Sequence, residues 1–176
     1  MAEMTDAMKR IKKDIEDDIH KFAQTYVQYA ADTASFMMKE EAKRILIENF
    51  YNAYKPKIYE RTYNIRDNSY EASTGKVVGG FVNGSGSYSC KAILTVSSDN
   101  MFEYPTGTLP YKDTTLIAVD VWYFGSHGGI VETGSIEDIV EKAFEDTSVT
   151  GQKIRNMAAD FAYAQARYGH YKILKF

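Results

Sequence analysis

Apolar residues near the start of the chain recur at steps of three and four, the spacing of one face of an α-helix. Charged residues of both signs lie between them, which is typical of a solvated face. Neither Pro nor Gly occurs from Thr5 to Tyr54, and Thr5 or Asp6 can cap the helix start. The apolar stripe comprises Met4, Met8, Ile11, Ile15, Ile19, Phe22 and Tyr26. The pattern predicts a long N-terminal helix or a helix pair.

The length of this helix leaves two alternatives open. A continuous helix of about fifty residues would extend about 75 Å, which is longer than a domain of this size can cover. Asp32-Thr33-Ala34-Ser35 is the weakest helical segment. Either the helix breaks near residues 32–35, or residues 1–32 project as an arm that packs on another subunit. The narrow apolar seam favours a partner helix over burial in a broad core.

Residues 51–70 mark the change from helix to sheet. Pro56 cannot sit in a helix interior, because proline lacks an N–H donor and its ring clashes with the preceding turn. Beyond this point, short apolar and alternating runs bounded by turn residues predict strands. The strands are expected at residues 76–83, 88–97 and 115–124, with a hairpin turn at 84–87 and a long loop at 98–114.

Two helices are predicted after the strands. The first spans about residues 135–144 and begins with a sequence similar to a capping box. The second spans about residues 152–168 and can be capped by Ser148 or Thr150. The C-terminal tail, residues 171–176, could add an edge strand.

The order of these elements predicts an α+β fold in a single domain, residues 1–176, with residues 1–32 as a possible projecting arm. An antiparallel sheet of three to four strands would be covered on one face by two C-terminal helices. The length of 176 residues suits one domain with a core of its own. Hydrophobic and charged fractions of 44% and 26% are those of a soluble globular protein, which argues against general disorder.

Charge and cysteine content exclude several classes of protein. A net charge of -3 gives no general attraction to nucleic acid or to an acidic membrane. The single cysteine, Cys90, excludes an intramolecular disulfide and a cysteine-based zinc site. No signal peptide is visible, and no stretch approaches the ~20 apolar residues that span a bilayer. We therefore expect a protein that crosses no membrane by these routes.

Few residues suggest catalysis. His127, in the glycine-rich turn at residues 125–129, is the best candidate for a functional histidine, although a turn role is simpler. Cys90 falls on an apolar strand face, where an inert thiol is expected. The segment 54–66 alternates basic and tyrosine residues and could contact nucleic acid. We expect no enzyme, cofactor or metal site; the alternatives are a hydrolase-like domain using His127 and a nucleic-acid-binding module using segment 54–66.

Two short motifs resemble those of a known family. After a proline, the run Arg61-Thr62-Tyr63-Asn64-Ile65-Arg66-Asp67-Asn68-Ser69 is similar to a Thr-Gly-x-Leu-Arg-x-Ser turn, with Tyr63 in place of Gly and Ile65 in place of Leu. Residues 122–126, Trp-Tyr-Phe-Gly-Ser, resemble the family's later aromatic strand, which precedes a helix. Over residues 40–145 the chain resembles the tail-completion (head–tail joining, minor tail) proteins of long-tailed bacteriophages.

This resemblance implies a non-enzymatic virion structural protein that forms a ring, commonly of six subunits, at the head–tail joint. The implied partners are copies of itself, head connector or portal-adaptor proteins, and tail terminator or tail tube proteins. The protein would occur in the host cytoplasm during assembly and then in the virion, with no membrane or specific nucleic acid bound. The residues expected to make subunit or partner contacts are Tyr59, Arg61, Arg66, Phe102, Tyr104 and Tyr111.

Overall fold

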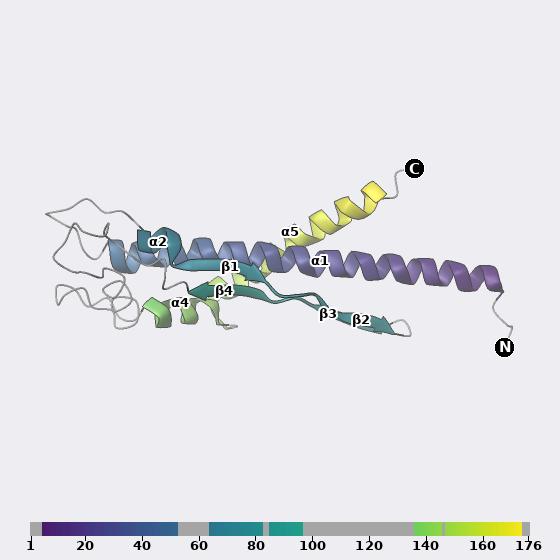
Figure 1. Cartoon of the computed structure of the whole chain (residues 1–176), viewed down its shortest axis with the longest axis horizontal. Coiled ribbons are helices and arrows are strands. Elements are labelled where there is room, and N and C mark those ends of the chain that lie inside the picture. The colour runs from purple at the N-terminus through teal and green to yellow at the C-terminus, as the bar shows by residue number, and fades with distance from the viewer. Residues whose placement is uncertain (1–4, 53–63, 83–84, 97–135, 146, 174–176) are drawn as a thin grey trace. The chain divides into compact units, whose positions relative to one another are not determined.

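The computed structural model describes residues 5–52, 64–82, 85–96, 136–145 and 147–173. These residues form an α+β fold with a long N-terminal helix, a small antiparallel sheet of four strands and two C-terminal helices, which confirms the predicted fold class (Figure 1). The elements are α1 (Asp6–Leu46), the π-helical turn η1 (Ile47–Tyr51), α2 (Asn64–Asn68), β1 (Tyr70–Thr74), β2 (Val78–Val82), β3 (Ser85–Ser89), β4 (Ala92–Val96), α4 (Ile136–Phe144) and α5 (Val149–Ile173).

Helix α1 is continuous over its whole length. Thr5 caps it, because the Met8 amide donates to the Thr5 hydroxyl at 3.5 Å and the Lys9 amide to the Thr5 carbonyl at 3.1 Å. The alternative of a break at residues 32–35 is wrong. Ala31, just before this weak segment, and Ser35, its last residue, are both buried. Packing at these two positions overrides the low local propensity.

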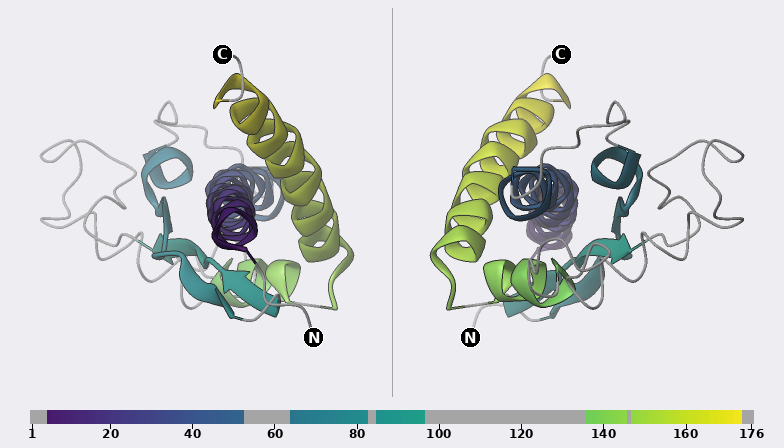
Figure 2. Two further views of the ribbon diagram at one scale, coloured as in Figure 1. Left: turned by 90° about the vertical axis from the view of Figure 1, so that its right-hand side faces the viewer. Right: turned by 90° about the vertical axis from the view of Figure 1, so that its left-hand side faces the viewer.

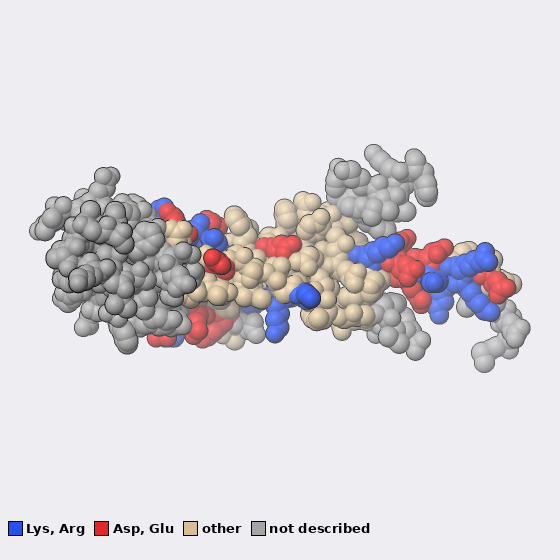
Figure 3. Space-filling model, viewed as in Figure 1, with Lys and Arg blue, Asp and Glu red and all other residues tan. Residues whose placement is uncertain are grey.

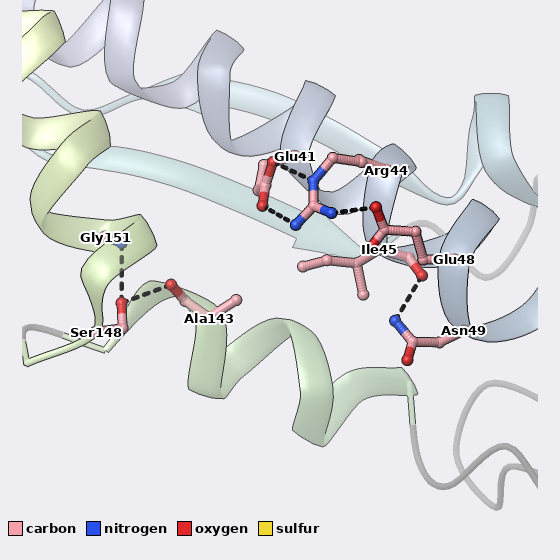
Figure 4. Close-up of polar contacts among 8 residues, drawn as sticks. All are labelled: Glu41, Arg44, Ile45, Glu48, Asn49, Ala143, Ser148 and Gly151. Atoms are coloured by element: carbon pink, nitrogen blue, oxygen red, sulfur yellow. Dashed lines mark hydrogen bonds and ion pairs between the residues drawn. The ribbon is translucent and has the colours of Figure 1, made fainter.

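The C-terminal end of α1 is held by local polar contacts. Arg44 donates to both carboxylate oxygens of Glu41, at 2.8 and 2.5 Å, and also pairs with Glu48 (Figure 4). These hydrogen bonds raise the pKa of the Arg44 guanidinium. The helix then widens into η1, in which the Asn52 amide donates to the Ile47 carbonyl at 2.9 Å. The helical path therefore ends before Pro56, as proline requires.

The chain divides into two compact units, and one of them, residues 35–73 and 94–154, contains the main hydrophobic core. In this core the end of α1 packs with residues of β1, β4 and α4. Its buried members are Ala42, Ile45, Leu46, Tyr51, Tyr70 and Val140, and the half-buried ones are Leu94, Val96, Ile139, Ala143 and Phe144. The expectation of a single domain stays a prediction.

A tight corner joins α4 to the first residues of α5, which belong to the same unit (Figure 2). The Ser148 hydroxyl accepts from the Gly151 amide at 2.9 Å and donates to the Ala143 carbonyl at 2.6 Å (Figure 4). Ser148 therefore caps α5, and it is one of the two residues predicted for this role. A Cβ at Gly151 would lie 2.8 Å from both the Ser148 hydroxyl and the Glu145 carbonyl oxygen. Glycine is needed here because the end of α4 approaches the start of α5 so closely.

The other unit comprises residues 1–34, 74–93 and 155–176. Strands β2 and β3 pair antiparallel, in a register that runs from Val78 opposite Ser89 to Val82 opposite Ser85. Gly79 has a φ of 129°, and a Cβ there would overlap the backbone of the opposite strand. Helix α5 buries three alanines spaced by four, Ala158, Ala162 and Ala166.

The structure corrects several strand boundaries. The predicted strand 88–97 is interrupted after β3, and β4 begins at Ala92. Strand β1 was not among the strands predicted from the apolar pattern, and it pairs with β4, while β2 pairs with β3. The edge strand expected at residues 171–176 is wrong over 171–173, because α5 continues through Ile173. The strand expected at 115–124 lies outside the described residues.

Candidate functional site

Helix α1 carries a stripe of large apolar side chains that the fold leaves in contact with solvent. We call Met8, Ile11, Ile15 and Ile19 the arm stripe; their exposed fractions are 57%, 59%, 55% and 43%. Single exposed apolar residues are ordinary, whereas a contiguous row of them marks a surface that binds another molecule. The steps of three and four place all four side chains on one face of the helix.

The arm stripe ends where α1 meets another part of its own unit. The Phe22 ring packs edge-on against the Tyr163 ring of α5, with centroids 6.4 Å apart. Just before this contact, Ile15, Asp18, Ile19 and Phe22 line an open hollow of about 320 Å³. The apolar seam predicted from the sequence is therefore partly covered from Phe22 onward and exposed over residues 8–19.

Charged side chains surround the arm stripe and are segregated by sign (Figure 3). The basic residues Lys9, Arg10, Lys12 and Lys13 come first, and the acidic residues Asp14, Glu16, Asp17 and Asp18 follow. Two ion pairs are formed within the helix: Lys9 with Asp6 at 3.5 Å, and Lys12 with Glu16 at 3.8 Å. Such exposed pairs contribute little to stability, about 0.5 kcal/mol or less each. These charges therefore remain available to an approaching molecule.

Further along α1, polar side chains attach the helix to the strand region. The His20 ring is hydrogen-bonded to the Tyr88 hydroxyl and packs edge-on against the Tyr88 ring, with centroids 5.2 Å apart. Further along the helix, the Gln28 side-chain amide donates to the Asp32 carboxylate at 2.9 Å and to the Thr74 hydroxyl at 3.2 Å. The Thr74 hydroxyl donates to the same carboxylate at 2.9 Å. These contacts were not predicted, because the partners lie more than forty residues apart. The spacing of four between Gln28 and Asp32 was the only local signal.

An open hollow of about 690 Å³ lies beside this polar network. Its lining residues are Gln24, Thr25, Gln28, Tyr29, Thr74, Gly75, Lys76 and Val77. Two of these residues, Gln28 and Thr74, belong to the network. Their side chains are already hydrogen-bonded to other protein groups. We therefore assign the network to attaching α1 to the strands.

Cys90 adjoins the same network and has the environment of an unreactive thiol. Its Sγ donates to the Gly75 carbonyl at 3.3 Å. Burial raises the pKa of the Cys90 thiol, and the negative charge of Asp32 raises it further. A nucleophilic cysteine requires the opposite shift, toward the thiolate. The pairing of Cys90 with His127 cannot be placed, because His127 lies outside the described residues.

Of the six residues predicted to make contacts, the structure describes Arg66. Its guanidinium forms two hydrogen bonds of 2.7 Å with Asp67, and its amide donates to the Tyr51 hydroxyl at 3.3 Å. The hydrogen bond from Arg66 lowers the pKa of Asp67. Its contact role stays a prediction. The other five, Tyr59, Arg61, Phe102, Tyr104 and Tyr111, lie outside the described residues, as does the segment 54–63.

The described residues hold no group of three or more His, Cys, Asp and Glu side chains that could bind a metal ion. None of the helices in the described ranges is long and apolar enough to cross a membrane. Comparison with protein-family models, with curated proteins and with solved structures finds no match to this chain. The arm stripe is therefore the surface from which a function can be argued.

Proposed function

We propose that this protein is a non-enzymatic structural subunit that assembles with copies of itself and with neighbouring proteins. The observation that carries the proposal is the arm stripe, four large apolar side chains exposed in one row on α1. Burial of such a row against another protein removes apolar surface from water, which is the main driving force of protein association. The charges around the stripe supply selectivity for the partner.

The assembly that we propose is the head–tail joint of a tailed bacteriophage. The support comes from the motifs at residues 61–69 and 122–126 and from the order of helix, strands and helices over residues 40–145. In such a joint the subunit would form a ring, commonly of six copies, between connector or portal-adaptor proteins and tail terminator or tail tube proteins. The protein would then be in the host cytoplasm before assembly and in the virion afterwards.

The proposal is tested in the phage whose genome encodes the chain. A nonsense mutation in this gene should produce separate, DNA-filled heads and complete tails, and supplying the intact protein should join them. Electron microscopy of lysates provides the readout, and mass spectrometry of purified virions should detect the chain. Intact infectious virions that lack the protein would overturn the assignment to the joint.

A further inference from the structure

The spacing of the apolar seam in α1 follows an eleven-residue repeat. Positions 4, 8, 11 and 15 are each followed eleven residues later by another member of the seam, at 15, 19, 22 and 26. Eleven residues over three turns correspond to about 3.67 residues per turn, close to the value of about 3.6 for a straight α-helix. The exposed face therefore stays almost parallel to the helix axis. A straight partner helix can follow it without left-handed supercoiling.

The charges on this part of α1 change sign at its midpoint. Four basic residues occur in positions 9–13 and four acidic residues in positions 14–18, so the boundary falls between Lys13 and Asp14. The same boundary is the centre of the arm stripe, because Met8 and Ile19 lie equally far from it. Figure 3 shows basic and acidic side chains in adjoining patches near the N-terminal end of α1.

We propose that residues 8–19 pair with the same segment of a second copy of the chain, antiparallel, about a two-fold axis near Lys13 and Asp14. In this arrangement Lys9 and Arg10 of each copy lie level with Asp18 and Asp17 of the other, and Met8 lies level with Ile19. The basic half of each segment therefore lies alongside the acidic half of the other. A parallel pair in register would oppose like charges along the whole segment, which is unfavourable.

The size of the surface makes this pairing weak and reversible. The segment spans about three helical turns. Its four half-exposed side chains per copy present far less than the about 800 Å² per partner that a stable interface buries. A two-fold contact of this kind joins two copies and closes, whereas a ring requires head-to-tail contacts. The pairing is thus separate from the ring contact. It rests on the arm stripe, as the proposed self-assembly does, but not on the assignment to a phage joint.

Charge reversal in the full-length protein tests the antiparallel arrangement. In K9E/R10E the four attractions with Asp17 and Asp18 become repulsions, so the association constant should fall about tenfold or more at low salt. The variant K9E/R10E/D17K/D18K reverses both sides and should restore association to about the wild-type value. The control K76E/K91E makes the same change in net charge on exposed lysines of the strand region and should leave association unchanged.

Sedimentation velocity over a range of protein concentrations measures these association constants, and circular dichroism confirms that each variant is folded. Weaker association in K9E/R10E with recovery in the fourfold variant supports the pairing. Unchanged or stronger association in K9E/R10E overturns it, because a parallel pair in register opposes like charges at these positions both before and after the reversal. A failure here leaves the proposed role in the phage joint intact, since that role is tested by virion assembly.

Disulfide cross-linking provides a second measurement of the orientation. In a C90S background, Met8→Cys and Ile19→Cys chains are mixed and oxidised mildly, because positions 8 and 19 lie on the paired face and level with each other. Serine can retain the hydrogen bond that Cys90 donates to the Gly75 carbonyl, so the background should fold normally. The antiparallel pair predicts that the mixed disulfide between positions 8 and 19 forms fastest. Dominant cross-links between identical positions, or no cross-link above the rate of random collision, would reject the proposal.

Discussion

Replacing Ile15 with asparagine tests whether the arm stripe serves the fold or binding. Ile15 is 55% exposed, whereas Leu46 on the same helix is 0% exposed and lies in the main core. Full burial of an isoleucine side chain contributes about 2 kcal/mol, so the half-exposed Ile15 should contribute roughly 1 kcal/mol or less. Isoleucine and asparagine also have similar helix propensities. Ile15→Asn should therefore lower the free energy of unfolding by no more than roughly 1 kcal/mol.

Leu46→Ala gives the comparison, because it leaves a cavity among buried residues. Its expected cost is about 3 kcal/mol. Phe36→Asn is a matched control for Ile15→Asn: Phe36 is 60% exposed on the same helix but lies off the apolar seam. Ile15→Asn should weaken self-association, and Phe36→Asn should not.

The measurement is urea-induced unfolding followed by circular dichroism, at concentrations where the wild-type protein is monomeric. Working at low concentration separates the stability of the chain from that of the assembly. If Ile15→Asn destabilised the monomer as strongly as Leu46→Ala, the stripe would be part of the internal packing. The arm stripe would then not be a binding surface.

Two further predictions concern Ser148, at the corner between α4 and α5, and the thiol of Cys90. Ser148→Ala removes the cap of α5 and the hydrogen bond to the Ala143 carbonyl. It should lower the free energy of unfolding by about 1 to 2 kcal/mol, measured by thermal or urea unfolding. An equal loss in Thr147→Ala, a change at the exposed neighbouring residue, would contradict the capping role. Folding raises the pKa of the Cys90 thiol above its unfolded value of 9.0. The thiol therefore stabilises the fold below pH 9.0, and this contribution is lost as the pH rises through the pKa of the folded state. Cys90→Ser should remove this alkaline decline, and an unchanged pH profile would reject it.

The helices were largely predictable from local sequence. The apolar period of α1, the cap at Thr5 and the cap at Ser148 depend on residues within one or two turns of each other. The continuity of α1 through residues 32–35 was not predictable from local propensity, and Ala31 and Ser35 are both buried there. Local propensity is a weak guide where tertiary packing decides.

The strands were harder because their partners lie far away in the sequence. Strand β1 is five residues long and pairs with β4, which starts almost twenty residues later. The interruption at Cys90 and Lys91 has no turn residue, and it depends on contacts such as the bond from Cys90 to the Gly75 carbonyl. The arm stripe could be found from its period, but its exposure needed the structure. The polar network around Gln28 could hardly be predicted, because most of its partners lie far apart in the sequence.

Gly79 provides a marker by which relatives of this protein could be recognised. At a φ of 129°, with the opposite strand in the space of a Cβ, any other residue would force the hairpin apart. The closely packed Gly151 imposes a similar requirement between α4 and α5. Homologues too distant to share overall sequence similarity should still keep glycine at both positions. A search for this pair, combined with an eleven-residue apolar repeat upstream, relies on geometry instead of sequence identity.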